Sequence, residues 1–233
     1  MRRIVILAIV LGIAVVLPAS GSSSPRTAKV VLRSMRHAAL AQTSVHWGQN
    51  LFVVGKWHRR WISDVGTDSG YQVGILTSPV VGGKVREMLV DNTVYIKGNA
   101  AGLEDATDLS ADQATPYEGQ WISVPQDDEL YPELSDGLTL RSIVDDETPY
   151  GPLKLVTRTV NGKLFLVVRA RPEDGRYFAA SLAAPAKGKP LPARYQERRG
   201  RHEWLLGSFT NWNEPITVTA PETSVPIATV RGD

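Results

Sequence analysis

Hydrophobic positions follow different spacings along the chain, and each spacing predicts a different kind of element. Between Thr27 and Gln42, apolar and small residues recur every three or four positions with arginines opposite them, which predicts an amphipathic helix. The predicted apolar stripe consists of Val30, Val31, Ser34, Met35, Ala38 and Ala41. Between Ser44 and Gly98 the spacing becomes two and turn residues interrupt it, which predicts successive antiparallel hairpins.

The stretch from Asn99 to Thr148 shows neither spacing. Short apolar groups alternate there with polar turn residues, which predicts short helices and loops interrupted by one strand from Trp121 to Val124. Beyond Thr148 the two-residue alternation returns and continues to the end of the chain. A helix, a set of hairpins, a helical insertion and a second set of hairpins predict an α+β domain around an extended antiparallel sheet.

The register of one hairpin follows from the sequence. Asn161-Gly162 lies between two alternating runs and favours a two-residue turn in which both central residues have positive φ, so that Val160 faces Lys163. One face of this hairpin is aliphatic apart from threonines and collects Leu153, Leu155, Leu164, Leu166 and Val168. The other face is mixed and consists of Lys154, Val156, Arg158, Lys163, Phe165, Val167 and Arg169.

A second predicted hairpin turns at Asp91-Asn92 and collects Leu89, Val94 and Ile96 on its apolar side. Together with the five aliphatic residues of the other hairpin, these three are the candidate lining of an apolar ligand cavity. A packed core needs the same residue types, so the pattern leaves a cavity and a core open as alternatives.

The first residues of the chain predict export. Arg2 and Arg3 precede an unbroken apolar run from Ile4 to Leu17, and small residues follow before Ser22. As a helix this run spans roughly 21 Å, which is short for a hydrocarbon core of about 30 Å, so cleavage is favoured over an uncleaved anchor. We therefore expect a signal peptide or anchor at residues 1–21, a linker at 22–26 and a single domain at 27–230, located in the cell envelope or secreted.

The charge balance and the cysteine content limit the kinds of partner and of membrane attachment that the protein can have. Residues 1–21 contain two of the 26 Lys and Arg residues and none of the 24 Asp and Glu residues, so the rest of the chain is formally neutral. This balance argues against a nucleic-acid partner, whereas the basic runs at 58–60 and 198–202 leave contact with a membrane surface open. The chain has no cysteine, and Ser22 takes the place of the acylated cysteine of a lipoprotein cleavage box, which excludes lipid attachment to cysteine.

The sequence contains no recognised catalytic or metal-binding motif. Its four histidines lack the spacing of metal ligands, and it has no glycine-rich phosphate loop and no nucleophile motif. We therefore predict no catalytic residues, no metal and no cofactor. Serines and acids occur, but no known spacing joins them, so a hydrolytic enzyme is the weakest of the interpretations.

Three segments carry a resemblance to a known family. They are GGKVREMLVDNTVYIKG at Gly82–Gly98, GQWISV at Gly119–Val124 and FTNWNEPITVTAP at Phe209–Pro221. With these segments in the expected order, Ala28–Ile227 resembles the actinobacterial envelope lipoproteins of the LppX/LprAFG family, whose fold is similar to that of the lipoprotein carrier LolA. The resemblance implies a strongly curved antiparallel half-barrel, wrapped around the N-terminal helix and the helical insertion, and an apolar cavity for acyl chains.

These observations lead to two functional hypotheses. The first is an exported, monomeric, non-catalytic protein that carries or shelters the acyl chains of a cell-envelope lipid or glycolipid, since acyl chains are held by burial in a dry lining. The alternative is a structural or interaction module of the envelope with the same fold and a filled cavity.

Overall fold

The computed structural model describes residues 27–55, 57–77, 82–170 and 178–232, and the predicted signal segment and linker lie outside these ranges. The strands are β1 (Ser44–Val53), β2 (Trp57–Gly66), β3 (Gly70–Thr77), β4 (Gly82–Val90), β5 (Thr93–Gly98), β6 (Ile122–Pro125), β7 (Leu153–Val160), β8 (Lys163–Ala170), β9 (Phe178–Pro185), β10 (Arg194–Arg199), β11 (Glu203–Thr210) and β12 (Val225–Pro226). The helices are α1 (Ala28–Leu40), α2 (Ala100–Thr107), α3 (Ala111–Ala114), the 3₁₀ helix η1 (Thr115–Tyr117), α4 (Tyr131–Ser135), α5 (Leu140–Asp146) and α6 (Ile227–Arg231).

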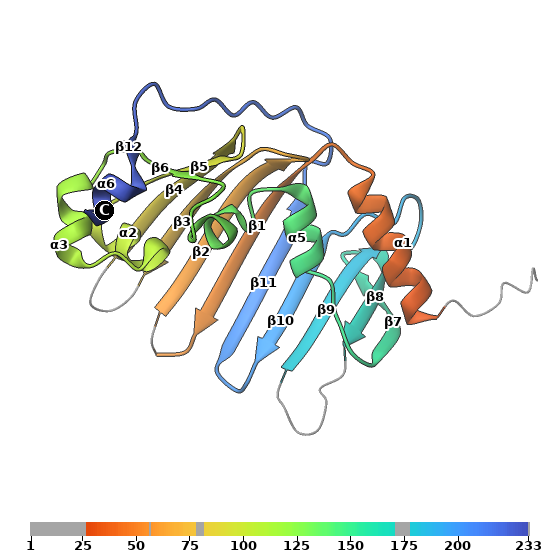
Figure 1. The fold of residues 1–233 in the computed structure, drawn as a ribbon. Coiled ribbons are helices and arrows are strands. Elements are labelled where there is room, and N and C mark those ends of the chain that lie inside the picture. Colours follow the sequence, from red (N-terminus) through yellow and green to blue (C-terminus); the bar gives the residue numbers. More distant parts are fainter. Residues whose placement is uncertain (1–26, 56, 78–81, 171–177, 233) are drawn as a thin grey trace, which may run out of the picture.

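The strands form one curved sheet that does not close on itself (Figure 1). Its order is β12-β6-β5-β4-β3-β2-β1-β11-β10-β9-β8-β7, and neighbouring strands are antiparallel except for β12 and β6. The predicted α+β class and the curved antiparallel sheet are confirmed. In the described part of the chain, no helix combines the length and the apolar character needed to cross a membrane.

The helices divide into two groups on the same side of the sheet, which we call the helix-facing side (Figure 1). α1 and α5 contact each other, and α1 also packs against β7 and β8. α2, α3, α4 and α6 gather at the other end of the sheet, over β4, β5 and β6. Each group closes a separate hydrophobic cluster, so the sheet has two cores rather than one.

Both predicted hairpins have the predicted register. β7 and β8 pair with Val160 opposite Lys163, and the turn residues Asn161 and Gly162 have φ values of 50° and 74°. β4 and β5 pair around Asp91 and Asn92, which also have positive φ. The predicted helices and loops between Asn99 and Thr148, with one strand among them, are confirmed as α2 to α5 and β6.

The apolar stripe of α1 differs from the predicted one. Thr27 caps the helix, because its hydroxyl accepts a hydrogen bond from the amide of Val30 at 3.3 Å. The buried residues are Val31, Leu32, Met35, Ala38 and Ala39. The prediction was wrong at Val30, Ser34 and Ala41, which are exposed, because the helix turns Leu32 and Ala39 toward the sheet instead.

The prediction of strands up to the end of the chain was wrong beyond β11. Residues 211–224 form no regular element and run along one end of the sheet to β12 (Figure 1). Pro215 and Pro221 lack the amide hydrogen that a sheet ladder requires, which explains why this segment does not pair. β12 then pairs in parallel with β6, with Val225 opposite Ile122, and α6 ends the described chain.

Candidate functional site

Alternation along the strands gives the sheet two chemically different sides. On β8, Val168 packs into the core beneath α1, whereas Val167 and Arg169 point to the opposite side. We call this opposite side the helix-free side. It is the face that the sequence predicts as mixed.

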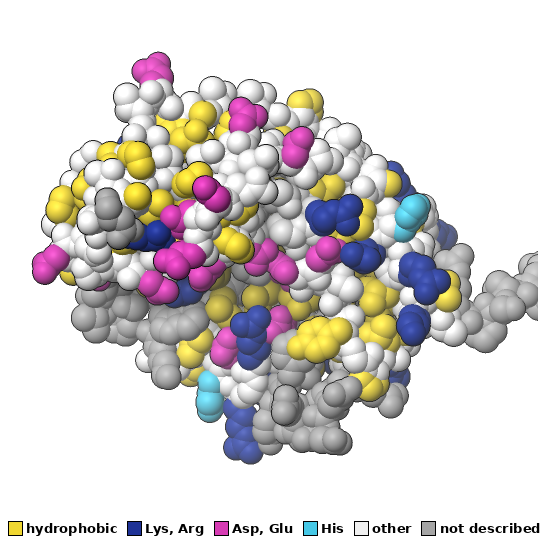
Figure 2. All heavy atoms as spheres, viewed as in Figure 1, with side chains coloured by type: hydrophobic (Ala, Val, Ile, Leu, Met, Phe, Trp, Pro, Cys, Tyr) yellow, Lys and Arg dark blue, Asp and Glu magenta, His cyan; other side chains and the backbone are white. Residues whose placement is uncertain are grey.

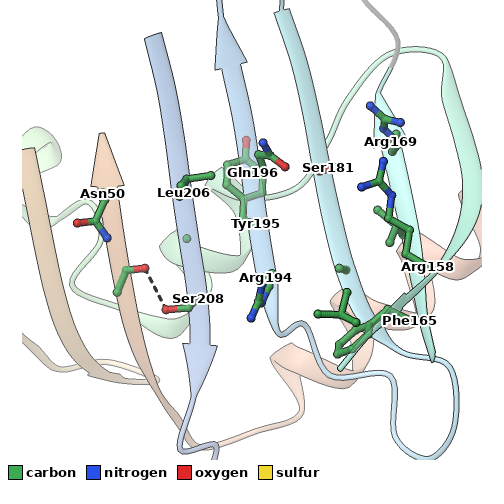
Figure 3. A pocket seen from close by; sticks show the side chains of 15 residues that line it. Asn50, Arg158, Phe165, Arg169, Ser181, Arg194, Tyr195, Gln196, Leu206 and Ser208 are labelled. Atoms are coloured by element: carbon green, nitrogen blue, oxygen red, sulfur yellow. Dashed lines mark hydrogen bonds between the residues drawn. The ribbon is translucent and has the colours of Figure 1, made fainter. Parts of the chain in front are cut away.

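A pocket of about 420 Å³ lies on the helix-free side of β1 and β7 to β11 (Figure 3). Four of the residues that line it are small: Gly48, Ser181, Ala183 and Ser208. Ala183 pairs with Arg194, which pairs in turn with Ser208, and Ser208 pairs with Gly48. Three small residues and one arginine therefore follow one another across four neighbouring strands. The hollow arises because these small side chains leave space that larger neighbours enclose.

The wall of the pocket combines apolar and cationic side chains. Phe165, Val167 and Leu206 provide the apolar part, and Leu206 is 43% exposed. Arg158, Arg169 and Arg194 are exposed and line the same pocket (Figure 3). None of the described residues that line it is an aspartate, a glutamate or a histidine. The pocket is thus a partly apolar site with a positive rim.

Hydrogen-bonding groups complete the lining. The hydroxyl of Ser208 donates to the carbonyl oxygen of Gly48 at 3.4 Å. Asn50, Ser181 and Gln196 contribute further donors and acceptors from three different strands. Such groups can orient a polar part of a ligand while the apolar wall covers the rest.

The eight predicted lining residues all lie on the helix-facing side, and seven of them belong to or pack against its two separate clusters. Leu89, Val94 and Ile96 are buried in the cluster that α2, α3 and α6 cover. The other five belong to the β7–β8 hairpin: Val168 is buried, Leu153, Leu155 and Leu166 are partly buried against the α1 cluster, and Leu164 is 47% exposed. None of the eight lines the pocket on the helix-free side. Their role in holding a ligand stays a prediction.

A buried polar chain crosses the helix-facing side. Ser63 on β2 donates to Gln72 on β3 at 2.7 Å, and Gln72 donates to Glu87 on β4 at 2.8 Å. Burial raises the pKa of Glu87 from 4.5 to about 7, against the smaller lowering effect of the Gln72 bond. The sequence carried a signal for this group, because Glu87 alternates with Leu89 and Val85 on an inward-facing set of positions.

A second group of buried polar residues lies beside the C-terminal end of α5. Gln49 donates to one oxygen of Glu147 at 2.9 Å, and the other carboxylate oxygen is buried with no hydrogen-bond partner. Burial raises the pKa of Glu147 well above its ordinary value, and the charge of Glu197 adds to the effect. Tyr195 donates to Glu197 at 2.8 Å, and Arg199 donates to the other oxygen of Glu197.

These carboxylates do not form an open reaction site. Glu87, Glu147 and Glu197 are all buried on the helix-facing side, and none of them lines the pocket on the other side. Among the described residues, no cluster of three or more histidines and acids is arranged to hold a metal ion.

Comparisons with known proteins identify the fold. No protein-family model and no curated protein matches the sequence. Among solved structures, LprF from Mycobacterium bovis is 13% identical, with 83% of this chain and 96% of that chain covered at a TM-score of 0.51. The lipoprotein LppX from Mycobacterium tuberculosis is 14% identical, with 82% of this chain and 98% of that chain covered at a TM-score of 0.49. The predicted resemblance is confirmed as a likeness of fold, which this chain shares with LprF.

Proposed function

We propose that the protein is an exported, monomeric, non-catalytic binding protein that carries or shelters the acyl chain of a cell-envelope lipid or glycolipid. The observation that carries this proposal is the pocket of about 420 Å³ on the helix-free side. Ligand pockets typically have volumes of about 300 to 1,000 Å³. The predicted lining residues lie on the other side of the sheet, so the proposed acyl-chain site differs from the one that the sequence suggests.

The apolar wall supplies the driving force for binding an acyl chain. Leu206 and Phe165 expose apolar surface in the pocket, and each methylene that leaves water against such surface contributes about 0.8 kcal/mol. The lining is unsuited to hydrolysis. Ser181 and Ser208 have no histidine or carboxylate among the described lining residues to act as their base.

A lysolipid titration tests this proposal. The purified chain is titrated with lysophosphatidylcholine below its micelle concentration, and bound lipid is counted by native mass spectrometry. We expect one lipid per chain, and Leu206→Asp should weaken binding at least about tenfold because it places a charge on the apolar wall. Ile75→Asp is the matched control, since Ile75 is similarly exposed, at 37% against 43%, on the same side of the sheet but lies outside this pocket. No bound lipid, or equal binding by the Leu206→Asp variant, would overturn the proposal.

The packing of the helix-facing side supports a second candidate function. Met35 of α1 and Val168 of β8 are completely buried in the cluster between the helices and the sheet. A module with this fold and a filled interior would act through its outer surface, as a structural or interaction protein of the envelope. The same titration separates the two candidates, because such a module binds no lysolipid.

A further inference from the structure

The three arginines of the pocket have no acidic partner among the residues that the structure describes. Arg158 on β7, Arg169 on β8 and Arg194 on β10 form no ion pair and no hydrogen bond with any described residue. Elsewhere Arg231 binds Asp128 through both of its terminal nitrogens, at 2.9 and 3.1 Å, and Arg36 binds Asp145. The pocket therefore gathers positive charge that none of the described residues neutralises.

No aspartate or glutamate is among the described residues that line the pocket. Figure 2 shows acidic side chains over the region of α2 to α5 on the helix-facing side, and basic side chains around α1. In Figure 3 the guanidinium groups of Arg158 and Arg169 reach the same end of the pocket, and Arg194 lies across it. Because like charges repel, an anion bound between the three guanidinium groups would reduce the repulsion among them.

Arginine is well suited to one class of anion. Its planar guanidinium presents paired donors that match the oxygens of a phosphate group, and such charge-assisted bonds are stronger than neutral ones. Ser181 is the β9 residue that pairs with Arg169, so a hydroxyl group lines the pocket on the strand next to this arginine. Phe165 and Val167, on the same strand as Arg169, continue the pocket with apolar surface. One end of the pocket thus suits a phosphate and the adjoining part suits a hydrocarbon chain.

We infer that Arg158, Arg169 and Arg194 bind the phosphate headgroup of a single anionic lipid, whose acyl chain lies along the apolar wall of the same pocket. This inference rests on the proposed function and names the class of lipid. In this arrangement the guanidinium groups contact the phosphate headgroup, and Phe165 and Leu206 contact the acyl chain.

The test compares two lysolipids with the same acyl chain. Lysophosphatidylglycerol carries a net negative charge and lysophosphatidylcholine carries none, and both are titrated below their micelle concentrations by calorimetry. We expect the anionic lipid to bind about tenfold more tightly, and added salt to reduce this preference because it screens exposed charges. Arg158→Gln combined with Arg169→Gln should lower the affinity for lysophosphatidylglycerol to that for lysophosphatidylcholine, which loses less because its choline cation already offsets the charge of its phosphate.

Arg198→Gln combined with Arg60→Gln is the matched control for charge, because it also removes two exposed positive charges on the helix-free side. Arg198 is exposed on the same side of β10, but it lies outside the pocket and donates to the carbonyl oxygen of Gly200. The control variant should keep the preference for the anionic lipid. Loss of the preference in this variant would show that net charge, rather than the pocket, selects the lipid, and would overturn the inference.

The outcomes separate the inference from the proposed function. Equal affinity for the two lysolipids overturns the headgroup assignment and leaves acyl-chain binding intact. Binding of neither lysolipid overturns the proposed function and the inference with it. If inorganic phosphate binds as tightly as lysophosphatidylglycerol, the pocket is an anion site to which the acyl chain of the lipid contributes nothing. Binding to phosphatidylglycerol vesicles without binding to monomeric lipid would indicate a membrane-docking surface, and either result overturns the inference.

Discussion

The two sides of the same strands differ more than the two ends of the sheet do. On β11, Gly207 faces the core and lies against the ring of Trp47, whereas its neighbour Ser208 faces the pocket. On β8 the same step along the chain separates the buried Val168 from the exposed Arg169. Because successive side chains of a strand point to opposite sides, the same strand contributes to a packed core on one side and to an open pocket on the other. The difference teaches that the sizes of alternate residues decide which side of the sheet is filled.

The largest expected effect on the free energy of unfolding comes from replacing an aromatic residue in the core, compared with replacing one in the pocket wall. Trp47 is 3% exposed and its ring centroid lies 4.3 Å from that of Phe209, so Trp47→Ala should lower the free energy of unfolding by about 3–5 kcal/mol. Phe165→Ala removes a partly buried ring from the pocket wall and should cost about 1 kcal/mol. Urea denaturation measures both values. Equal losses would contradict the assignment of the core to one side only.

The next effect concerns pH and the buried carboxylates of the helix-facing side. The pKa of Glu87 is about 7 in the folded chain and 4.5 when unperturbed, so between these values the folded state binds more protons than the unfolded state. The contribution of Glu87 to the free energy of unfolding is therefore complete below about pH 4.5 and is lost as the pH rises through 7.

Glu87→Gln should flatten this dependence. The variant keeps an oxygen that can accept the Gln72 bond but has no buried charge to form, so its free energy of unfolding above pH 7 should rise by up to about 3 kcal/mol. Urea denaturation across the pH range measures the slope. Glu222→Gln, which alters an exposed carboxyl, is the control and should leave the slope as it is. An unchanged slope in the Glu87→Gln variant would show that this carboxyl does not carry the predicted dependence.

Two glycines on adjacent strands provide a smaller and closely matched contrast. A Cβ atom added at Gly207 would lie 1.8 Å from the ring of Trp47, whereas one added at Gly48 would approach only the hydroxyl of Ser208, at 3.4 Å. Gly207→Ala should therefore cost about 1–3 kcal/mol through overpacking. Gly48→Ala should change the free energy of unfolding by less than about 0.5 kcal/mol. Thermal unfolding of the two variants in parallel checks the difference, and a reversed order would refute the assignment of the sides.

Local signals in the sequence were sufficient for the hairpins. Asn161-Gly162 and Asp91-Asn92 predicted the register of their hairpins correctly, because a two-residue turn with positive φ fixes which residues face each other. The short helices of the insertion were also predictable from their capping residues. Ser110 and Thr139, for example, each form a capping box at the start of a helix.

The pocket could not be predicted, because it depends on pairing between distant parts of the chain. Gly48 and Ser208 become neighbours only where β1 pairs with β11, and no local pattern specifies that pair. The mixed face of the β7–β8 hairpin was predicted. Arg158 and Arg169 line a pocket, however, only because small residues on β9 and β11 leave space beside them. For the same reason, the two hairpins whose apolar faces were expected to share one cavity belong to separate clusters.

The smallest expected effect tests whether surface charge stabilises either side. Arg36 on α1 donates two hydrogen bonds to Asp145 on α5, at 2.6 and 3.1 Å, but both side chains are more than 40% exposed. A double-mutant cycle with Arg36→Ala and Asp145→Ala should give a coupling of about 0.2–1 kcal/mol that falls with added salt. Arg158→Ala on the other side should change the free energy of unfolding by less than about 0.5 kcal/mol, since this arginine has no acidic partner among the described residues. A coupling well above 1 kcal/mol would mean that this ion pair, and not only the burial of Met35 and its neighbours, holds the two helices together over the core.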